Sequence, residues 1–225
     1  MKNEYGILMS TPMIQAYMAG TKNQTRRLKE LDVINLDPDG WELDDNPFRA
    51  NYVVFRRKED KTETRLVLYP YGKVGGNLWF RETWTVFVDG VLPYIYKADC
   101  LPNVAGHVKW KPSLHMPRVA ARFTPKLLSY RLERLQDITE DDAINEGLEI
   151  LHQQKEYNIY KGYHGPTVNG GFTNPKIAYE NLWDMLNSKP KKGKNGKIKP
   201  AYPWSSNPWV WVVEFERFQI SQHQL

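Results

Sequence analysis

The sequence has a single cysteine, Cys100, and five scattered histidines in 225 residues. One thiol excludes an intramolecular disulfide and multi-cysteine zinc sites, and the histidines never fall at metal-ligand spacing. The most apolar late stretch, 209–218, contains Glu214, Glu216 and Arg217, so we expect neither a membrane span nor a signal peptide. We expect the protein to be in a reducing compartment, by default the cytoplasm, and to have no metal, no cofactor and no membrane partner.

Signatures of several enzyme classes are also absent. The chain has no Walker glycine loop, no Gly-x-Ser-x-Gly elbow and no His-Glu-x-x-His helix. A Mg²⁺ ion held by carboxylates and phosphate would leave little trace in a sequence and stays open. What the chain does have is 41% hydrophobic and 13% aromatic residues, including eight Trp, which is enough to bury a core.

The positive charge is concentrated in one segment. The chain has 31 basic and 26 acidic side chains, a net charge of +5. Without the six lysines of segment 189–199, 25 basic side chains remain against 26 acidic ones. Two interpretations stay open, a solvated connection and a flexible arm that binds the phosphates of a nucleic acid. The six lysines of this arm are Lys189, Lys191, Lys192, Lys194, Lys197 and Lys199.

Runs of β-branched and aromatic residues predict a mainly β scaffold. Turn residues at 59–61 and at Asp89-Gly90 predict two hairpins. Segment 37–46 is acidic and turn-rich, and segment 152–173, rich in Gly, Tyr and His, is expected to be a long loop or an insertion near a site. The expected strands are 7–9, 51–57, 64–69, 78–88, 91–98, 118–123, 127–135 and 209–218.

Three helices are expected from capping residues. Ser10 precedes a proline and opens a helix that ends at Gly20, and Thr139 opens a second helix that ends at Gly147. Asn174 opens the third, before Pro175. The third helix carries a wide apolar stripe, formed by Ala178, Tyr179, Leu182, Trp183, Met185 and Leu186.

The segment after the first helix, 21–27, is crowded with polar and cationic side chains and is expected to be a loop that carries function. Within 19–27, residues Gly20, Lys22, Thr25 and Arg27 resemble the Gly-x-Lys-x-x-Thr-x-Arg signature of ASCH domains, which belong to the PUA-like superfamily of small β-barrels that bind RNA or modified bases. Segments 75–82, 138–148 and 211–215 are similar to later family motifs, in the same order. The longer pattern resembles large ASCH proteins of tailed phages and prophages, which implies a phage or prophage origin in a bacterial host.

The resemblance implies an α+β fold, a PUA-like, mainly antiparallel β-barrel with flanking short helices and long insertions. Compact ASCH domains are about half as long as this chain. We therefore expect one domain over 1–225 with insertions near 35–74, 88–117, 149–173 and 188–206. Asn23 and Asn77 depart from the family pattern, which more often has Thr and Asp there.

The resemblance also implies a catalytic set. One bacterial branch of the family removes the acetyl group from the exocyclic amine of acetylated cytidine with a Lys, a Thr and a Glu, which fall here on Lys22, Thr25 and Glu146. A neutral lysine can take the hydroxyl proton of a threonine nucleophile, and a glutamate can orient the amine or protonate the leaving group. Composition alone predicts instead a solvated loop and a surface glutamate. As loop and helix-end groups, Lys22 and Glu146 are expected to tolerate alanine with little change in stability.

Substrate binding is expected from cations and aromatic rings near these motifs. Arg27 matches the family arginine, and Arg26 and Arg81 are its neighbours in sequence or pattern. A guanidinium makes two parallel hydrogen bonds to a phosphate or a base carbonyl. Trp79 is the expected stacking platform for a base, with Tyr71 and Trp84 as alternatives. Packing in the core is the competing interpretation for each tryptophan.

These observations favour a protein that binds a nucleoside or a nucleic-acid base, with amide hydrolysis on an acylated cytidine-like base as the expected reaction. The alternative is a non-catalytic module that reads RNA or modified DNA. A metal-dependent ribonuclease is third, and a structural role in phage assembly is fourth. The expected partner is a nucleoside or a nucleic acid, with RNA favoured over DNA.

Overall fold

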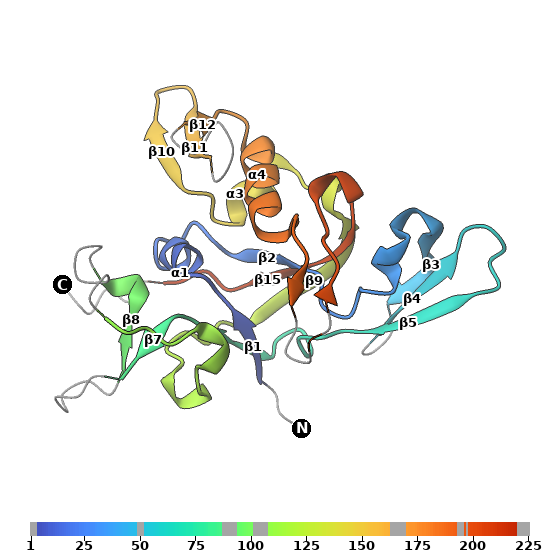
Figure 1. Ribbon diagram of the computed structural model, residues 1–225, viewed down its shortest axis with the longest axis horizontal. Helices are drawn as coiled ribbons and strands as arrows, with labels where there is room; N and C mark the ends of the chain where they lie inside the picture. Colours follow the sequence, from blue (N-terminus) through green and yellow to red (C-terminus); the bar gives the residue numbers. More distant parts are fainter. Residues whose placement is uncertain are drawn as a thin grey trace. The chain divides into compact units, whose positions relative to one another are not determined.

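The fold is mixed α+β, with many short strands and few helices (Figure 1). The computed structural model describes residues 4–48, 52–86, 94–100, 108–162, 170–192, 196 and 198–219, without the side chains of 45–48. Among these residues the strands form several small sheets, and no closed barrel is found. The same residues contain no helix with the length and apolar character needed to cross a membrane.

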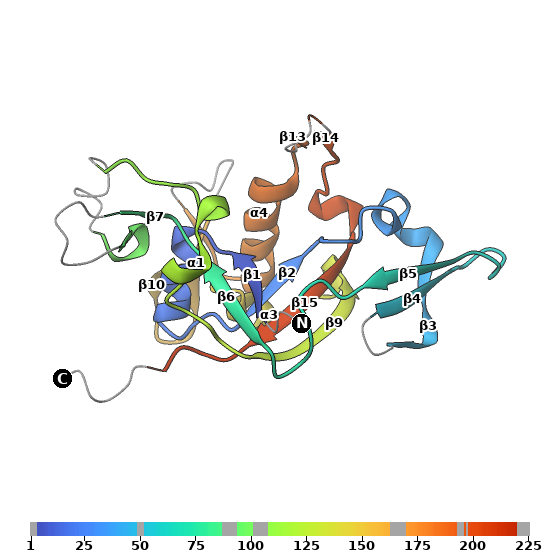
Figure 2. The ribbon, with the colours of Figure 1, turned by 90° about the horizontal axis from the view of Figure 1, so that it is seen from below.

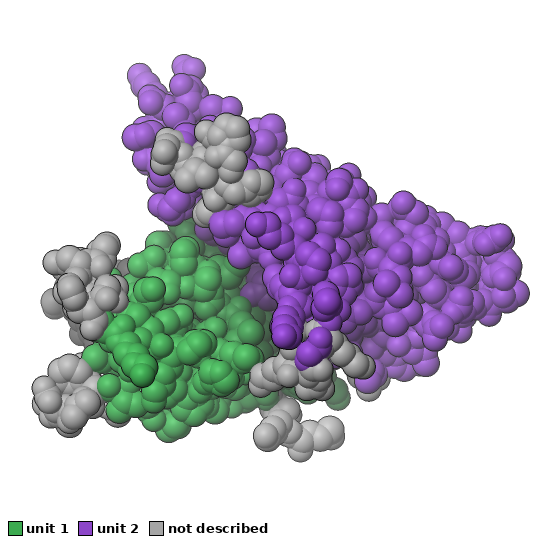
Figure 3. Space-filling model, viewed as in Figure 1, with its two compact units in different colours: residues 1–23, 71–129, 214–225 green, residues 24–70, 130–213 purple. Residues whose placement is uncertain are grey.

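The chain divides into two compact units (Figure 3). Each is assembled from segments that are distant in sequence, and two of the boundaries between the units fall within strands β9 (Leu127–Arg134) and β15 (Trp209–Phe215). Both strands confirm runs that the sequence predicts. Unit 1 contains Met1–Asn23, Tyr71–Ser129 and Glu214–Leu225, and unit 2 contains Gln24–Pro70 and Tyr130–Val213.

Unit 1 begins with strand β1 (Glu4–Leu8), which pairs in parallel with β6 (Asn77–Arg81). Helix α1 (Thr11–Met18) follows and confirms the predicted helix. The Ser10 hydroxyl accepts a hydrogen bond from the Met13 amide at 3.4 Å, as an N-cap should. At the other end Gly20 adopts a φ of 72°, a conformation that favours glycine.

The rest of unit 1 is less regular than expected. Strands β7 (Trp84–Thr85) and β8 (Ile95–Tyr96) pair antiparallel, and the predicted Asp89-Gly90 turn lies outside the described residues. The predicted strand 118–123 is wrong. Its first residues form a 3₁₀ turn directly after Pro117, whose ring fixes a φ compatible with that turn. The 3₁₀ helices are η3 (Lys97–Asp99), η4 (Ser113–His115) and η5 (Arg118–Ala120).

An aromatic cluster forms part of the core of unit 1. The ring of Tyr17 packs edge-on against Phe80, Phe123 and Phe215, with centroid distances of 4.9, 5.4 and 5.9 Å. Burial, with a contribution from Glu216, raises the pKa of Tyr17 to about 12. The apolar face of α1 is therefore anchored by a neutral tyrosine.

Most residues of a three-stranded sheet of order β2-β15-β9 belong to unit 2. Strand β2 (Gln24–Arg27) corrects the prediction that the whole segment 21–27 is a loop. Its four residues are polar or charged, so no apolar alternation marks them as a strand. Pairing with the buried central strand β15 explains the extended backbone, and three of the four residues are buried.

Two capped helices of unit 2 confirm their predictions. The Thr139 hydroxyl accepts a hydrogen bond from the Asp142 amide at the start of α3 (Glu140–Asn145), and Asn174 caps α4 (Pro175–Asn187) through the Ile177 amide. Part of the predicted stripe of α4 is buried, whereas Met185 and Leu186 are exposed. The core cluster contains Leu135, Ile138, Ala143, Leu148, Tyr160, Ala178, Tyr179, Trp183, Trp204 and Val210.

Three small sheets lie within segments where insertions are expected. The sheet β3-β4-β5 contains Trp41–Phe48, Tyr52–Arg57 and Thr64–Leu68, and its β4-β5 hairpin confirms a prediction. The sheet β10-β11-β12 contains Ile150–Gln153, Asn158–Lys161 and Gly171–Phe172, and β13 (Lys191–Lys192) pairs with β14 (Ile198–Lys199). Unit 2 also has the 3₁₀ helices Ile34–Leu36, Pro38–Gly40, Leu135–Asp137 and Trp204–Ser206.

Two of these sheets contain strands where the sequence shows no clear strand pattern. The acidic, turn-rich segment 37–46 contains the first part of β3, where Asp44 forms a 2.8 Å ion pair with Arg56 of the adjacent strand. Segment 152–173 contains β11 and β12, where Gly171 lies directly opposite Lys161. A Cβ at Gly171 would lie 2.2 Å from the side chain of Ile159, so the glycine allows a close strand approach.

Candidate functional site

Strand β2 presents two different polar faces. Side chains alternate along a strand, so Gln24 and Arg26 share one face and Thr25 and Arg27 share the other. The Gln24 amide donates hydrogen bonds to the backbone carbonyl and to Oδ1 of Asp142, at 2.6 and 3.0 Å. The first face therefore contacts helix α3.

Arg26 connects β2 to three carboxylates of unit 2. Its Nε and Nη2 donate to Oε1 of Glu133, at 2.9 and 2.5 Å. Its Nη2 also donates to Oδ2 of Asp142 at 3.0 Å, and its Nη1 donates to Oε1 of Glu146 at 3.2 Å. The side chain of Arg26 is 0% exposed. Burial by itself lowers the pKa of Arg26, but Glu146 and Glu133 raise it above its ordinary value, so the guanidinium stays charged.

Arg131 completes this cluster from the edge of the sheet. It donates to Oε2 of Glu133 at 3.0 Å and to Oδ2 of Asp142 at 2.6 Å. Burial by itself raises the pKa of Asp142. The hydrogen bond from Gln24 and the charges of Arg26 and Arg131 lower that pKa by a larger amount, so the net shift is downward. We call these five residues, Arg26, Arg131, Glu133, Asp142 and Glu146, the arginine cluster; its formal charge is −1.

Thr25 lies on the opposite face of β2 and is 0% exposed. Its Oγ1 accepts a short hydrogen bond from Nη1 of Arg27, and the same nitrogen donates to the backbone carbonyl of Arg26 at 2.9 Å. This bond leaves the hydroxyl proton of Thr25 available to another acceptor. A cationic donor also stabilises negative charge that develops on Oγ1.

Lys22 and Glu146 are buried, with 0% and 4% of their surface exposed. The interpretation of these residues as a solvated loop and a surface charge is therefore wrong. Lys22 belongs to unit 1, where its amide donates to the carbonyl of Ala16 at 3.2 Å. Glu146 is the C-cap residue of α3, and its side chain faces Arg26. Buried charges of this kind are uncommon unless they are paired.

The expected substrate-binding residues fall into two groups. Arg27 adjoins Thr25, whereas the donors of Arg26 all meet carboxylates, so contact between Arg26 and a substrate would require those contacts to be exchanged. Trp79 and Arg81 lie on β6 in unit 1, with the Arg81 guanidinium 5.2 Å from the Trp79 ring. Tyr71 and Trp84, the alternative stacking residues, are buried.

The structure describes four of the six lysines of the expected arm. Lys189 follows α4, Lys191 and Lys192 form β13, and Lys199 ends β14. Lys194 and Lys197 lie outside the described residues. Across the part of the chain that the structure describes, no group of three His, Cys, Asp or Glu side chains has an arrangement that could hold a metal ion.

Arg131 and Glu133 were not among the residues that the sequence predicts for the site. They alternate in the predicted strand 127–135, which places both on one face, but polar alternation ordinarily marks a solvated face. Their partial burial depends on the charged strand β2, which lies on the other side of β15 in the same sheet. This arrangement follows from the strand pairing and cannot be recognised in the sequence of β9 alone.

Comparison with known proteins gives no relative: no family model, no curated protein and no solved structure matches this chain.

Proposed function

We propose that this protein binds a nucleoside or nucleic-acid base that carries an acylated exocyclic amine, and that it hydrolyses the amide bond. The observation that carries the proposal is the burial of Lys22, Thr25 and Glu146, which are 0%, 0% and 4% exposed. Burying an ionisable group is costly unless a partner or a function compensates. The resemblance of their motif to the ASCH signature supports the same three residues.

Thr25 is the proposed nucleophile. Its Oγ1 attacks the carbonyl carbon of the acyl group, a base takes the hydroxyl proton, and the bond to the exocyclic nitrogen breaks as that nitrogen gains a proton. Water then cleaves the acyl-threonine ester, releases the carboxylic acid and restores the hydroxyl. Arg27 stabilises the charge on Oγ1 through the hydrogen bond that the structure shows.

Lys22 and Glu146 are the proposed proton carrier and orienting group. Lys22 stands three residues before Thr25 in the chain and is the proposed base. Glu146 is fixed by its bond to Arg26 at 3.2 Å. In this proposal Arg26 is a positioning residue, because it acts on a substrate through Glu146.

The second candidate is a non-catalytic module that reads RNA or modified DNA. The complete burial of Thr25 favours it, because neighbouring side chains must move before a substrate carbonyl can reach Oγ1. A module that only binds a base has no such requirement.

Chromatographic assay of deacetylation of N4-acetylcytidine separates the two candidates. We expect turnover by the wild type, loss of turnover in T25V, K22A and E146Q, and partial activity in T25S, which keeps a hydroxyl. The matched control is T21V, because Thr21 lies in the same segment but donates its hydroxyl to the carbonyl of Ala16. A wild type that binds the nucleoside without turnover supports the binding module.

A further inference from the structure

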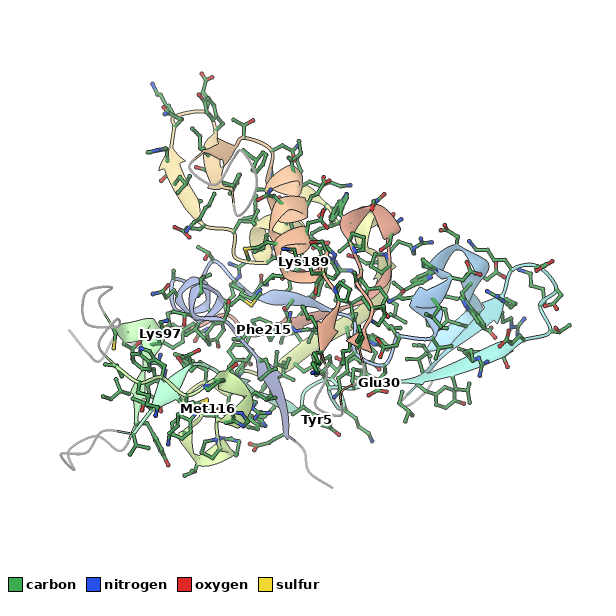
Figure 4. All side chains as sticks on the ribbon, in the orientation of Figure 1. Tyr5, Glu30, Lys97, Met116, Lys189 and Phe215 are labelled. Carbon is green, nitrogen blue, oxygen red and sulfur yellow. The ribbon has the colours of Figure 1, made fainter. Side chains whose placement is uncertain are left out.

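Unit 2 has a second site rich in charged side chains, a pocket with a volume of about 430 Å³. This volume is within the range of small-molecule sites, roughly 300–1,000 Å³. None of the proposed catalytic residues lines it. We call it the lysine hollow, and it is lined by Leu28, Lys29, Glu30, Asp32, Asn187, Lys189, Lys191, Lys199, Pro200 and Tyr202. Lys189 and Glu30 are labelled in Figure 4.

The lining carries a surplus of positive charge. The lining contains four lysines and two acidic residues, so its formal charge is +2. One of the acids, Asp32, accepts a hydrogen bond from the Tyr202 hydroxyl at 3.2 Å, so it also holds the wall of the hollow. Within the described residues, neither Lys189 nor Lys199 forms an ion pair with a carboxylate, so their charges are not compensated there.

The β13-β14 hairpin places two of these charges together. Lys191 and Lys199 are directly opposite each other in the antiparallel register (Figure 2 shows the hairpin beyond α4). Directly opposed like charges destabilise a strand pair. Partial desolvation of the largely exposed Lys191 side chain and the neighbouring charge of Lys199 lower the pKa of Lys191. The contact that Lys191 makes with Oδ1 of Asn187, at 3.3 Å, is to a neutral group and does not offset the repulsion.

An anion between the opposed lysines would remove this repulsion. Lysine ammonium groups are compact point charges that suit phosphate oxygens, and several of them around one hollow suit linked phosphates better than a single phosphate. We propose that the lysine hollow binds a polyphosphate group, either as inorganic polyphosphate or as the phosphate chain of a nucleotide.

Lys192 supplies the matched control. It lies on the same hairpin but pairs with Ile198, and it does not line the hollow. A variant at Lys192 removes the same charge from the same strand. A lysine arm that merely attracts nucleic acid would respond to either position, whereas a built site distinguishes them.

Isothermal titration with sodium pyrophosphate at constant ionic strength tests the proposal. We expect pyrophosphate to bind more tightly than orthophosphate, K191Q/K199Q to raise the dissociation constant at least tenfold, and K192Q to change it less than twofold. A second titration with a nucleoside diphosphate and its parent nucleoside separates the two sources. If the nucleoside diphosphate binds more tightly than pyrophosphate, the ligand of the hollow is a nucleotide. If the two bind equally, the ligand is inorganic polyphosphate.

Three outcomes would overturn the proposal: no pyrophosphate binding, equal losses in K191Q/K199Q and K192Q, or binding of single-stranded RNA that pyrophosphate does not displace. Circular dichroism confirms that each variant is folded. If the double variant does not fold, K189Q decides, because Lys189 lines the hollow from outside the hairpin. Deacetylation of a free nucleoside is measured in parallel, so failure of this site is distinguished from failure of the proposed hydrolase.

Discussion

Nη1 of Arg26 donates a hydrogen bond to Oε1 of Glu146 at 3.2 Å, and the two residues are 2% and 4% exposed. This contact changes what substitution at Glu146 should do. The sequence suggested that alanine would leave stability nearly unchanged, because the residue ends a short helix. A buried carboxylate that pairs with a buried guanidinium instead contributes to the folded state, so E146A should destabilise the protein.

The first prediction concerns Arg26. Replacement with methionine removes the cation that three carboxylates share, and leaves Glu146 buried without it. Removing one partner of a buried ion pair costs about 3–5 kcal/mol. We expect R26M to lower the free energy of unfolding by that amount in urea denaturation.

An exposed ion pair in the same unit is the control for R26M. Arg56 pairs with Asp44 at 2.8 Å, and its side chain is 42% exposed. Surface pairs contribute about 0–1 kcal/mol, so R56M should change stability by no more than that. If R26M and R56M lower the free energy of unfolding by similar amounts, the arginine cluster contributes no more to stability than an exposed ion pair.

The second prediction concerns acid. The pKa of Asp142 is lowered in the folded protein below its ordinary 3.8, so the unfolded chain binds the proton more tightly. The stability that Asp142 contributes is complete well above pH 3.8 and is lost as the pH falls through the folded value. The difference in unfolding free energy between wild type and D142N should therefore be largest near neutrality and shrink below about pH 4.

Urea denaturation of both proteins at several pH values measures this difference. D141N is the control for loss of an acidic side chain at the start of α3, because Asp141 is an exposed neighbour. A wild-type to D142N difference that stays constant down to low pH would contradict the assigned direction of the shift.

The parts of the fold that depend on residues close together in the sequence could be predicted. The caps at Ser10, Thr139 and Asn174 all form, because each satisfies backbone amides within three residues of itself. The strands β9 and β15 carry enough apolar residues to be recognised.

The features that depend on distant partners were not predictable. Strand β2 consists of Gln, Thr and two Arg, and nothing local marks it as a strand. Its burial follows from pairing with a strand almost two hundred residues away, and from carboxylates on β9 and α3. The candidate residues were therefore named from the motif, but the role of Arg26 as the partner of Glu146 required the structure.

The third prediction rests on the proposed hydrolase and concerns Arg27. Its guanidinium donates to Oγ1 of Thr25 and favours the negative charge that Oγ1 gains when the base takes its proton, before the bond to the acyl carbon forms. A hydrogen bond to a charged group contributes about 1.5–3 kcal/mol, which corresponds to roughly a 10- to 150-fold change in rate. We expect R27M to lower kcat for acetylcytidine by about that factor with a smaller change in KM. R27K, which keeps a charge without the planar fork, should be intermediate. A reduced affinity with unchanged kcat would place Arg27 in substrate binding alone.

The fourth prediction concerns stability at the lysine hollow in the absence of a ligand. Lys199 directly opposes Lys191, and K199Q removes a like charge from this pair. Cross-strand charge pairs contribute roughly 0.2–1 kcal/mol, and both side chains here are exposed, so K199Q should raise the free energy of unfolding by an amount near the lower limit. K192Q, on the same strand as Lys191 but opposite Ile198, should give a smaller gain.

The dependence of this gain on pH and salt identifies its cause. Because the pKa of Lys191 is lowered below 10.5 in the folded protein, the unfolded chain binds more protons between the folded value and 10.5, and wild-type stability rises with pH across that window. Loss of the Lys191 charge relieves the same repulsion that K199Q removes, so the gain in K199Q should be full at neutral pH and shrink as the pH approaches 10.5. It should also shrink in about 1 M salt, where the Debye length falls to about 3 Å. A gain that is independent of both pH and salt would assign it to packing instead of to repulsion between the two lysines.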